Sequence, residues 1–286
     1  RDDLTGWAFA APFMILYLVF LAFPILASFV LSFTGFGLKD LSNPIGATFV
    51  GVDNYLSLLS DETFLKSLFN TFYFVVIGVP VTLAIGLVIA TALNRGISRF
   101  RTAFRVGYYL PVITSIVAIA VVWRFLLNPD VGLINMLLGG LGITGPAWLA
   151  DPVFAMPSII AMAVWRNLGF AMIVFLAGLQ AIPSSLYEAA AIDGAGSRQS
   201  FRYITIPMLR PTILFMTVIT TIGYLQLFEE PFVMTGGGPL DSTLSVTMYM
   251  YQQGFTFFHQ GYASAIAYVL FIIVAFVAFL QFKFLR

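Results

Sequence analysis

The chain has 286 residues, of which 60% are hydrophobic and only 9% are charged, and its formal net charge is +1. A soluble domain carries about 25% charged residues, so this composition cannot cover a water-soluble globule, and the apolar side chains must meet lipid. The mean hydropathy of +0.95 also indicates a protein whose apolar side chains face lipid. The absence of cysteine excludes thiol chemistry, and a single histidine, His259, excludes a metal site built on two imidazoles.

Six apolar stretches are each long enough to cross a bilayer, which takes about 20 residues in a helix. Hydrophobic side chains occupy every face of each stretch, as expected for helices surrounded by lipid and by other helices. The sequence therefore predicts an all-α membrane protein with six transmembrane helices in a single membrane domain, residues 1–286. The predicted spans are 7–33, 68–93, 106–127, 153–179, 211–234 and 262–284.

The first stretch is as long as a full span and lacks a small-residue cleavage site, so we expect a span and not a cleavable signal peptide. Gly78, Pro80 and Gly86 in the second stretch indicate a close helix contact or a kink. In the loops, residues 52–59 form an amphipathic pattern, and Asp151 followed by Pro152 is typical of a capped helix start.

The charged residues separate the two sides of the membrane. With six alternating spans, ten basic residues fall on one side: Arg1, Arg95, Arg99, Arg101, Arg105, Arg198, Arg202, Arg210, Lys283 and Arg286. The opposite loops carry Lys39, Asp40, Asp53, Asp61, Glu62, Lys66, Asp130, Asp151 and Asp241. Short basic loops mark the cytoplasm, so we expect both termini to be cytoplasmic. The net charge of +1 gives no indication of nucleic-acid binding, because the basic residues are sorted by membrane side.

The cytoplasmic segment 183–207 is the most informative part of the chain. Ser185 and Glu188 have the spacing of a capping box that starts a short helix. Gly194 and Gly196 end that helix, because glycine tolerates a left-handed turn. Ser197 is placed to cap a second short helix that stops before Pro207. This pattern predicts a thin helix–turn–helix suited to docking in a groove on a partner.

The same segment resembles the EAA loop of ABC importer permeases. Glu188-Ala189-Ala190, then Gly194, then Ile204-x-Ile206-Pro207 follow the family spacing, with isoleucine where the family pattern has leucine. The run through Asp193 and Ala195 resembles the sugar-importer branch, whose members include maltose, glycerol-3-phosphate and multiple-sugar permeases. Residues 235–239 (Thr-Gly-Gly-Gly-Pro) and 261–265 (Gly-Tyr-Ala-Ser-Ala) resemble its larger-permease type, and the likeness runs over nearly the whole chain.

The resemblance implies a type I ABC importer permease fold with a cytoplasmic coupling helix that inserts into an ATPase subunit. It implies coupling roles for Glu188, Ala189, Ala190, Asp193, Gly194, Ala195, Ile206 and Pro207. The implied partners are a second homologous permease, two copies of an ATP-binding subunit and an external solute-binding protein, in a bacterial or archaeal inner membrane. The chain has no phosphate-binding G-x-x-x-x-G-K-[ST] motif of its own. We therefore expect no enzymatic activity and no cofactor here, with ATP and Mg²⁺ bound by the partner ATPase.

Polar residues inside spans are costly and indicate function. A sugar pathway needs polar groups for hydroxyls and aromatic faces for C–H groups, and six residues offer that mixture: Trp165, Arg166, Asn167, Tyr224, Gln226 and Glu229. A structural alternative is an ion pair of Arg166 with Glu229 or Glu230, while Arg124 would extend to the outer interface near Asp130. Arg166 also fits an anionic solute of the glycerol-phosphate type.

Two other classes remain open. An ion-coupled secondary transporter predicts broken helices in two corresponding repeats, and the sequence has no such symmetry. An intramembrane enzyme needs a Ser/His or His/carboxylate set within the spans, and one histidine in an external loop gives little basis for it. The importer permease explains the loop and the topology together.

Overall fold

The computed structural model of the chain describes residues 2–43, 46–95 and 101–285. Arg1, Arg99 and Arg286, which we assign to the basic side, lie outside the described residues. The described residues are helical, with one isolated antiparallel bridge between Thr34 and Phe49 in place of any sheet.

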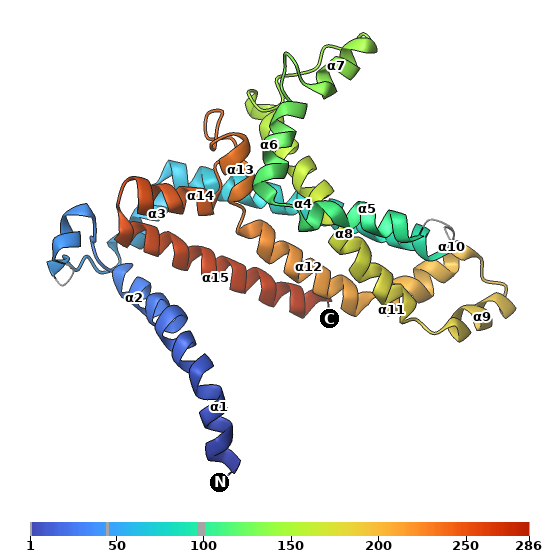
Figure 1. Cartoon of the computed structure of the whole chain (residues 1–286), viewed down its shortest axis with the longest axis horizontal. Coiled ribbons are helices and arrows are strands. Elements are labelled where there is room, and N and C mark those ends of the chain that lie inside the picture. Colours follow the sequence, from blue (N-terminus) through green and yellow to red (C-terminus); the bar gives the residue numbers. More distant parts are fainter. Residues whose placement is uncertain (1, 44–45, 96–100, 286) are drawn as a thin grey trace. The chain divides into compact units, whose positions relative to one another are not determined.

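The elements follow one another along the chain as shown in Figure 1. They are α1 (Asp2–Tyr17), the π-helical turn η1 (Leu18–Ala22), α2 (Phe23–Leu31), the 3₁₀ turn η2 (Leu38–Ser42), α3 (Asp53–Ser60), α4 (Glu62–Arg95), α5 (Arg101–Ile113), α6 (Ile116–Leu126), α7 (Leu133–Gly140), α8 (Pro152–Gln180), α9 (Ser184–Ile192), α10 (Ser197–Ser200), the π-helical turn η4 (Phe201–Thr205), α11 (Ile206–Met208), α12 (Arg210–Leu225), α13 (Glu229–Met234), α14 (Val246–Tyr251), the π-helical turn η5 (Gln252–Thr256) and α15 (Gln260–Leu285).

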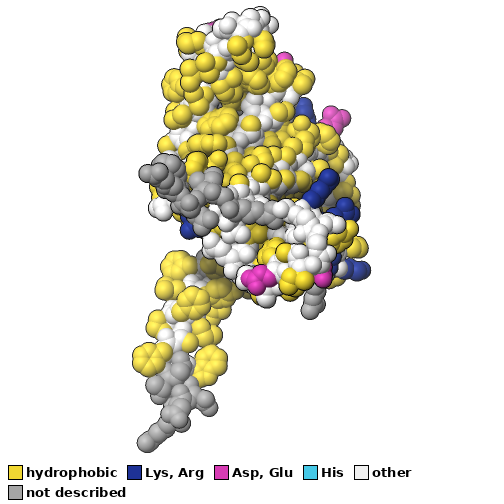
Figure 2. Space-filling view, turned by 90° about the vertical axis from the view of Figure 1, so that its right-hand side faces the viewer, with side chains coloured by type: hydrophobic (Ala, Val, Ile, Leu, Met, Phe, Trp, Pro, Cys, Tyr) yellow, Lys and Arg dark blue, Asp and Glu magenta, His cyan; other side chains and the backbone are white. Residues whose placement is uncertain are grey.

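Four helical stretches are long and apolar enough to cross a membrane: Phe9–Leu31, Glu62–Asn94, Pro152–Gln180 and Gln260–Phe284. Two bent helix pairs also pass, which gives six spans if each pair counts as one. Large hydrophobic side chains stay exposed along these helices, for example Phe13 at 73%, Val88 at 68% and Phe271 at 65%. Hydrophobic side chains also predominate on the face drawn in Figure 2. Such exposure suits a surface that meets lipid.

The third predicted span, 106–127, is not one continuous helix. It is divided into α5 and α6, whose axes differ by 99°. Pro111 removes a backbone donor near the end of α5, as proline always does. Ser115 then takes an extended ψ of 126°, so α6 starts anew at Ile116. The predicted span 106–127 is therefore a bent pair of helices and not one helix.

The fifth predicted span, 211–234, ends early. α12 stops at Leu225, and α13 is a separate helix that begins at Glu229. Pro231 lies in its first turn, and in a continuous helix its ring would clash with the carbonyl of Leu227. That carbonyl instead accepts a hydrogen bond of 2.5 Å from the Ser245 hydroxyl. The prediction that one helix continues to residue 234 is therefore wrong.

The chain divides into two compact units, Arg1–Leu65 with Val246–Ile273 and Lys66–Ser245 with Val274–Arg286. In the larger unit α8 lies against α5 and α12. A buried cluster, called here the inner core, fills the space between α4, α8 and α12. Its members are Ala90, Leu93, Ala171, Met172, Phe175, Leu176, Leu179, Ile182, Leu209 and Met216.

Glycines bring the helices of this unit close together. A Cβ on Gly86 would lie 2.6 Å from the Cβ of Ala171 on α8, and a Cβ on Gly78 would lie 2.8 Å from the Tyr224 ring on α12. The predicted close helix contact at these two glycines is confirmed. On α8 itself, Gly169 leaves no room for a Cβ against the backbone carbonyl of Tyr108.

Two local predictions in the loops are confirmed. Residues 52–59 coincide with the short helix α3. Asp151 is the N-cap of α8, and its carboxylate accepts a 2.8 Å hydrogen bond from the Val153 N–H, with Pro152 at the first helical position.

In the smaller unit, Asp61 joins three elements. Its Oδ1 accepts hydrogen bonds from the N–H groups of Thr63 and Phe64 at 2.9 and 3.0 Å, which caps α4. Its Oδ2 accepts from the hydroxyls of Tyr249 and Tyr262, each at 2.6 Å. Partial burial raises the pKa of Asp61, but these four hydrogen bonds stabilise the carboxylate and bring the pKa below its ordinary value of 3.8.

The lowered pKa of Asp61 determines how its contribution to the folding stability depends on pH. We expect Asp61→Asn to destabilise the protein at pH 7 by about 1–3 kcal/mol, because the charge-assisted bonds and the cap are weakened. The stability difference from wild type is fully present above the unfolded pKa of about 4 and shrinks as the pH falls through the lower folded pKa. Thermal unfolding of the detergent-solubilised protein between pH 8 and 3 measures it. Asp53→Asn is the matched control, and a difference that grows on acidification contradicts the prediction.

Candidate functional site

Segment 183–207 starts differently from the sequence prediction. α9 begins at Ser184, and its N-cap is Pro183, whose carbonyl accepts from the Leu186 N–H at 3.3 Å. Glu188 therefore lies too deep in the helix to be the third residue after the cap. The predicted capping box of Ser185 and Glu188 is wrong, because the extended ψ of 131° at Pro183 starts the helix earlier.

The end of α9 follows the prediction at Gly194 but not at Gly196, whose φ is −72° and which is the N-cap of the next helix. Gly194 has a φ of +79°, which is the left-handed region that glycine takes without strain. The Ala195 N–H donates to the Ala190 carbonyl at 2.8 Å, and the Gly194 N–H donates to the Ala191 carbonyl at 3.1 Å. These two bonds form a Schellman motif, which satisfies the last carbonyls of the helix.

The second helix departs from the prediction at both ends. Its N-cap is Gly196, not Ser197, and the Gln199 side chain accepts a 2.8 Å bond from the Gly196 N–H. The helix then continues through the π-helical turn η4 and α11, so it includes Pro207 and does not stop before it. The wider turn before Pro207 accommodates a residue without an N–H. The chain bends by 63° between Met208 and Arg210, where α12 begins.

The coupling residues named from the sequence differ in their exposure. Glu188, Ala189, Asp193 and Gly194 are exposed, whereas Ala190, Ala195, Ile206 and Pro207 are half-buried. The side chain of Ile192 is 87% exposed beside them. An exposed apolar residue among small residues and carboxylates makes this surface available for a partner.

Tyr187 ties the same segment to the spans, and the sequence reasoning missed it. Its hydroxyl and the hydroxyl of buried Thr205 lie 2.9 Å apart in a hydrogen bond. Its ring and the side chain of Ile204 pack against the inner core. The one feature of the sequence that could have indicated Tyr187 is its place directly before Glu188 on a nine-residue helix.

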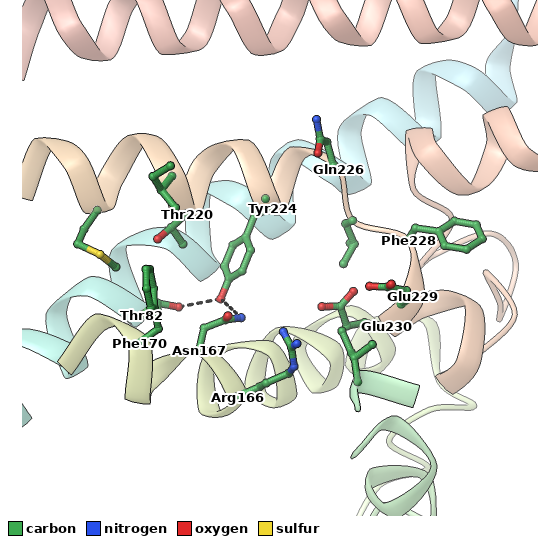
Figure 3. Close-up of a pocket in the computed structure, with 15 residues that line it drawn as sticks. Thr82, Arg166, Asn167, Phe170, Thr220, Tyr224, Gln226, Phe228, Glu229 and Glu230 are labelled. Carbon is green, nitrogen blue, oxygen red and sulfur yellow. Dashed lines mark hydrogen bonds between the residues drawn. The ribbon is translucent and has the colours of Figure 1, made fainter. Parts of the chain in front are cut away.

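The second candidate site is a pocket of about 330 Å³ in the larger unit. Five of the six predicted pathway residues line it: Arg166, Asn167, Tyr224, Gln226 and Glu229. Figure 3 shows that they come from α8, from the end of α12 and from the segment that follows. The break between α12 and α13 forms one wall. Lining residues not predicted for the pathway include Thr82, Phe170, Thr220, Phe228 and Glu230.

Tyr224 is the residue on which this pocket is organised. The hydroxyl of Thr82 donates to the Gly78 carbonyl at 2.8 Å, so the 2.9 Å bond between Thr82 and Tyr224 is donated by the tyrosine. Asn167 donates to the same Tyr224 oxygen at 3.4 Å (Figure 3). The ring also meets Phe74 edge-on, with centroids 4.8 Å apart. Tyr224 thus joins α4, α8 and α12.

Arg166 and two carboxylates occupy the other end of the pocket. Glu230 is buried, with 8% of its surface exposed, and Glu229 is exposed. Figure 3 draws the Arg166 guanidinium and the Glu230 carboxylate directed into the same space. The buried Nε of Arg166 has no hydrogen-bond partner among the described residues. The structure therefore provides a polar cavity lined by one cation and two carboxylates.

Trp165 is not part of this pocket. It lines two apolar hollows on other faces of α8, and its ring lies 5.8 Å from that of Trp123. Its neighbour Arg166 faces the pocket because adjacent helical residues point about 100° apart. The Gln226 amide points away from Arg166 (Figure 3), although the residue lines the cavity.

Two remaining predictions concern the position of Arg124 and the absence of a metal site. Arg124 donates a 3.1 Å hydrogen bond to the Val233 carbonyl on α13, so it supports the outer end of the pocket wall. In the described part of the chain, no group of three or more His, Cys, Asp or Glu residues could hold a metal ion.

Comparison with known proteins identifies relatives over the whole chain. A family model described as "binding-protein-dependent transport system inner membrane component" matches residues 62–285. A lactose transport system permease protein of Rhizobium radiobacter is 41% identical over 98% of this chain and 93% of its own length. An arabinooligosaccharide transport system permease protein of Bacillus subtilis is 33% identical, covering 97% and 87%.

A solved structure extends the comparison to three dimensions. A chain of a bacterial alginate ABC transporter, in complex with an alginate pentasaccharide-bound periplasmic protein, superposes with a TM-score of 0.85. The alignment covers 98% of this chain and 93% of that one at 25% sequence identity.

The hydrogen bond between Tyr224 and Thr82 is testable by a double-mutant cycle. Tyr224→Phe and Thr82→Val each remove one partner, and we expect a coupling energy of about 0.5–1.5 kcal/mol, since each remaining group keeps its shape. Equilibrium unfolding of the purified protein in detergent gives the four stabilities. Thr91→Val is the matched control on α4, because Thr91 bonds only within its own helix, to the Leu87 carbonyl. Strict additivity of Tyr224→Phe with Thr82→Val would rule the bond out.

Proposed function

The chain belongs to the family of binding-protein-dependent transport system inner membrane components, and we propose that it forms half of the translocation pathway for a sugar or oligosaccharide. It is a multi-pass membrane permease of an ABC importer, with the type I fold of that class. The family's membrane component is not itself catalytic.

The composition of the Tyr224 pocket carries the proposal of a sugar cargo. The cavity combines an amide at Asn167, hydroxyls at Thr82 and Thr220, charged hydrogen-bonding groups and the aromatic ring of Phe170. Hydroxyl groups need such donors and acceptors, and aromatic rings suit the C–H faces of a sugar. The relatives are named for lactose and arabinooligosaccharide transport, which is the same chemical class.

In this proposal a separate ATPase subunit supplies the free energy for transport by hydrolysing ATP. We propose that α9 docks in a cleft on that subunit, with Glu188 and Gly194 at the contact and ATP and Mg²⁺ bound by the partner. The packing of Tyr187 against the inner core supports this role, because it joins the segment to α4, α8 and α12, and the bond to Thr205 holds α9 to the helix that follows it. A population shift between inward- and outward-facing states then requires different contacts in each state.

The complete importer contains further subunits in this proposal. A second homologous permease closes the pathway, two ATP-binding subunits drive it, and an external binding protein delivers the solute. The alginate transporter is described with such a periplasmic protein. The membrane is that of a bacterial or archaeal cell, with both termini in the cytoplasm, as the basic loops indicate.

Docking of α9 is testable by co-purification. Glu188→Ala and Gly194→Pro should each reduce the amount of ATPase that co-purifies with the permease at least tenfold. Proline cannot take the φ of +79° found at Gly194, and the alanine variant removes an exposed charge. Asp130→Ala in an opposite loop is the matched control. Full retention of the ATPase by both variants would refute the docking role.

The pocket is testable by uptake. Arg166→Ala and Glu229→Ala should lower the uptake of the cargo at least tenfold while ATPase association stays intact, because each removes a hydrogen-bonding group from the pathway. The measurement is the uptake of a radiolabelled solute into proteoliposomes that contain the complete importer. The solute is the one that the external binding protein of this importer binds. Lys39→Ala, which removes a charge from a residue that is not among those lining the pocket, is the control. Unchanged uptake in both pocket variants shows that the cargo takes another route.

A further inference from the structure

The charges that line the Tyr224 pocket are unequal in number. Among its lining residues Arg166 is the one cation, while Glu229 and Glu230 are two carboxylates. Both acids belong to the first turn of α13, and Arg166 lies on α8, so the opposite charges face one another from different elements (Figure 3). The net charge of the lining is therefore negative with both carboxylates ionised and zero with one of them protonated.

Neither state gives an anionic solute a favourable site. A bare arginine would attract a carboxylate or phosphate strongly, because guanidinium matches their geometry with two parallel hydrogen bonds. Here an anion that approached Arg166 would also approach one or two carboxylates, and in the weakly polar surroundings of a membrane protein that repulsion is poorly screened. The buried position of Glu230, with 8% exposure, keeps solvent from relieving it.

The same groups suit uncharged hydroxyls. Arg166 lines the pocket, and its guanidinium carries only hydrogen-bond donors, so a ligand oxygen can accept from it without bringing a charge. The Glu229 carboxylate, together with the Asn167 and Thr220 side chains, offers acceptors for hydroxyl protons. A neutral polyol satisfies both sets at once, whereas an anion satisfies the donor and is repelled by the acceptors.

We propose that Glu229 and Glu230 are specificity-determining residues that make this pathway select uncharged sugars and reject anionic ones, such as uronates and sugar phosphates. This inference rests on the sugar cargo proposed above and narrows it. Selection of this kind works by building repulsion against the wrong ligand. It also assigns opposite roles to neighbouring groups, since Arg166 holds the solute and the two carboxylates exclude its charged analogues.

The test measures ligand binding to the complete importer in nanodiscs by calorimetry, without the binding protein, whose own specificity would mask the effect. The probes are lactose, maltotriose and cellobiose, each paired with the analogue in which a terminal CH₂OH is oxidised to a carboxylate. Wild type should bind at least one neutral sugar, and its carboxylate partner at least tenfold more weakly. Glu229→Gln with Glu230→Gln keeps the shape and one acceptor oxygen on each side chain, and it should reduce that ratio to about threefold or reverse it.

Asp130→Asn removes a negative charge outside the pocket lining and should leave the wild-type ratio unchanged. Equal or tighter binding of the carboxylate analogue to wild type would overturn the proposal, and so would a ratio that persists in the double glutamine variant. Both of those results leave the sugar cargo standing. If wild type binds none of the probes of either kind, the sugar cargo itself fails and the selectivity fails with it.

Discussion

Lipid offers no hydrogen bond to a backbone N–H or C=O, so every break in a membrane helix leaves groups that the protein itself must satisfy. This constraint explains where the present chain stays helical and where it does not. Between α12 and α13 the free carbonyl of Leu227 accepts from the Ser245 hydroxyl at 2.5 Å. At the outer end of the same wall the Val233 carbonyl accepts from Arg124. The irregular segment exists because side chains elsewhere in the chain supply its missing partners.

That irregular segment is also what creates the pocket. If α12 had continued to residue 234, Glu229 and Glu230 would have followed the helical path away from Tyr224. The break instead directs both carboxylates toward Arg166 on α8 (Figure 3). The cost of placing three ionisable groups at such a site is tolerated when they serve function. The polar cavity and the broken span are therefore one feature of the fold.

The docking segment and the pocket depend on the same helices. α8 carries Arg166 and Asn167 in the pocket and Phe175 in the inner core, on which Tyr187 packs. On α12, Met216 belongs both to the inner core and to the pocket lining. Glycines at positions 78 and 86 hold α4 against these helices without room for a methyl group. The docking proposed for α9 would therefore act on closely packed side chains, which have little room to absorb a displacement.

The sequence by itself determined the apolar stretches, the cap of α8 and the turn that ends α9, but not the breaks in the third and fifth predicted spans. These features depend on neighbouring residues alone. A run of apolar residues is long enough to cross the lipid, Asp151 caps the helix that follows it, and Gly194 takes the left-handed φ that ends α9. It also identified five residues of the pocket, because polar side chains in apolar spans are conspicuous. Only the tertiary structure decided which face each residue takes. Apolar residues lie on every face of α8, so its sequence has no apolar stripe that would separate Trp165, which lies outside the pocket, from Arg166, which lines it. The breaks at Ser115 and Gln226 could not be predicted from the sequence either, because proline and polar residues occur in intact spans as well. The partners that stabilise a break, such as Ser245, come from distant parts of the chain.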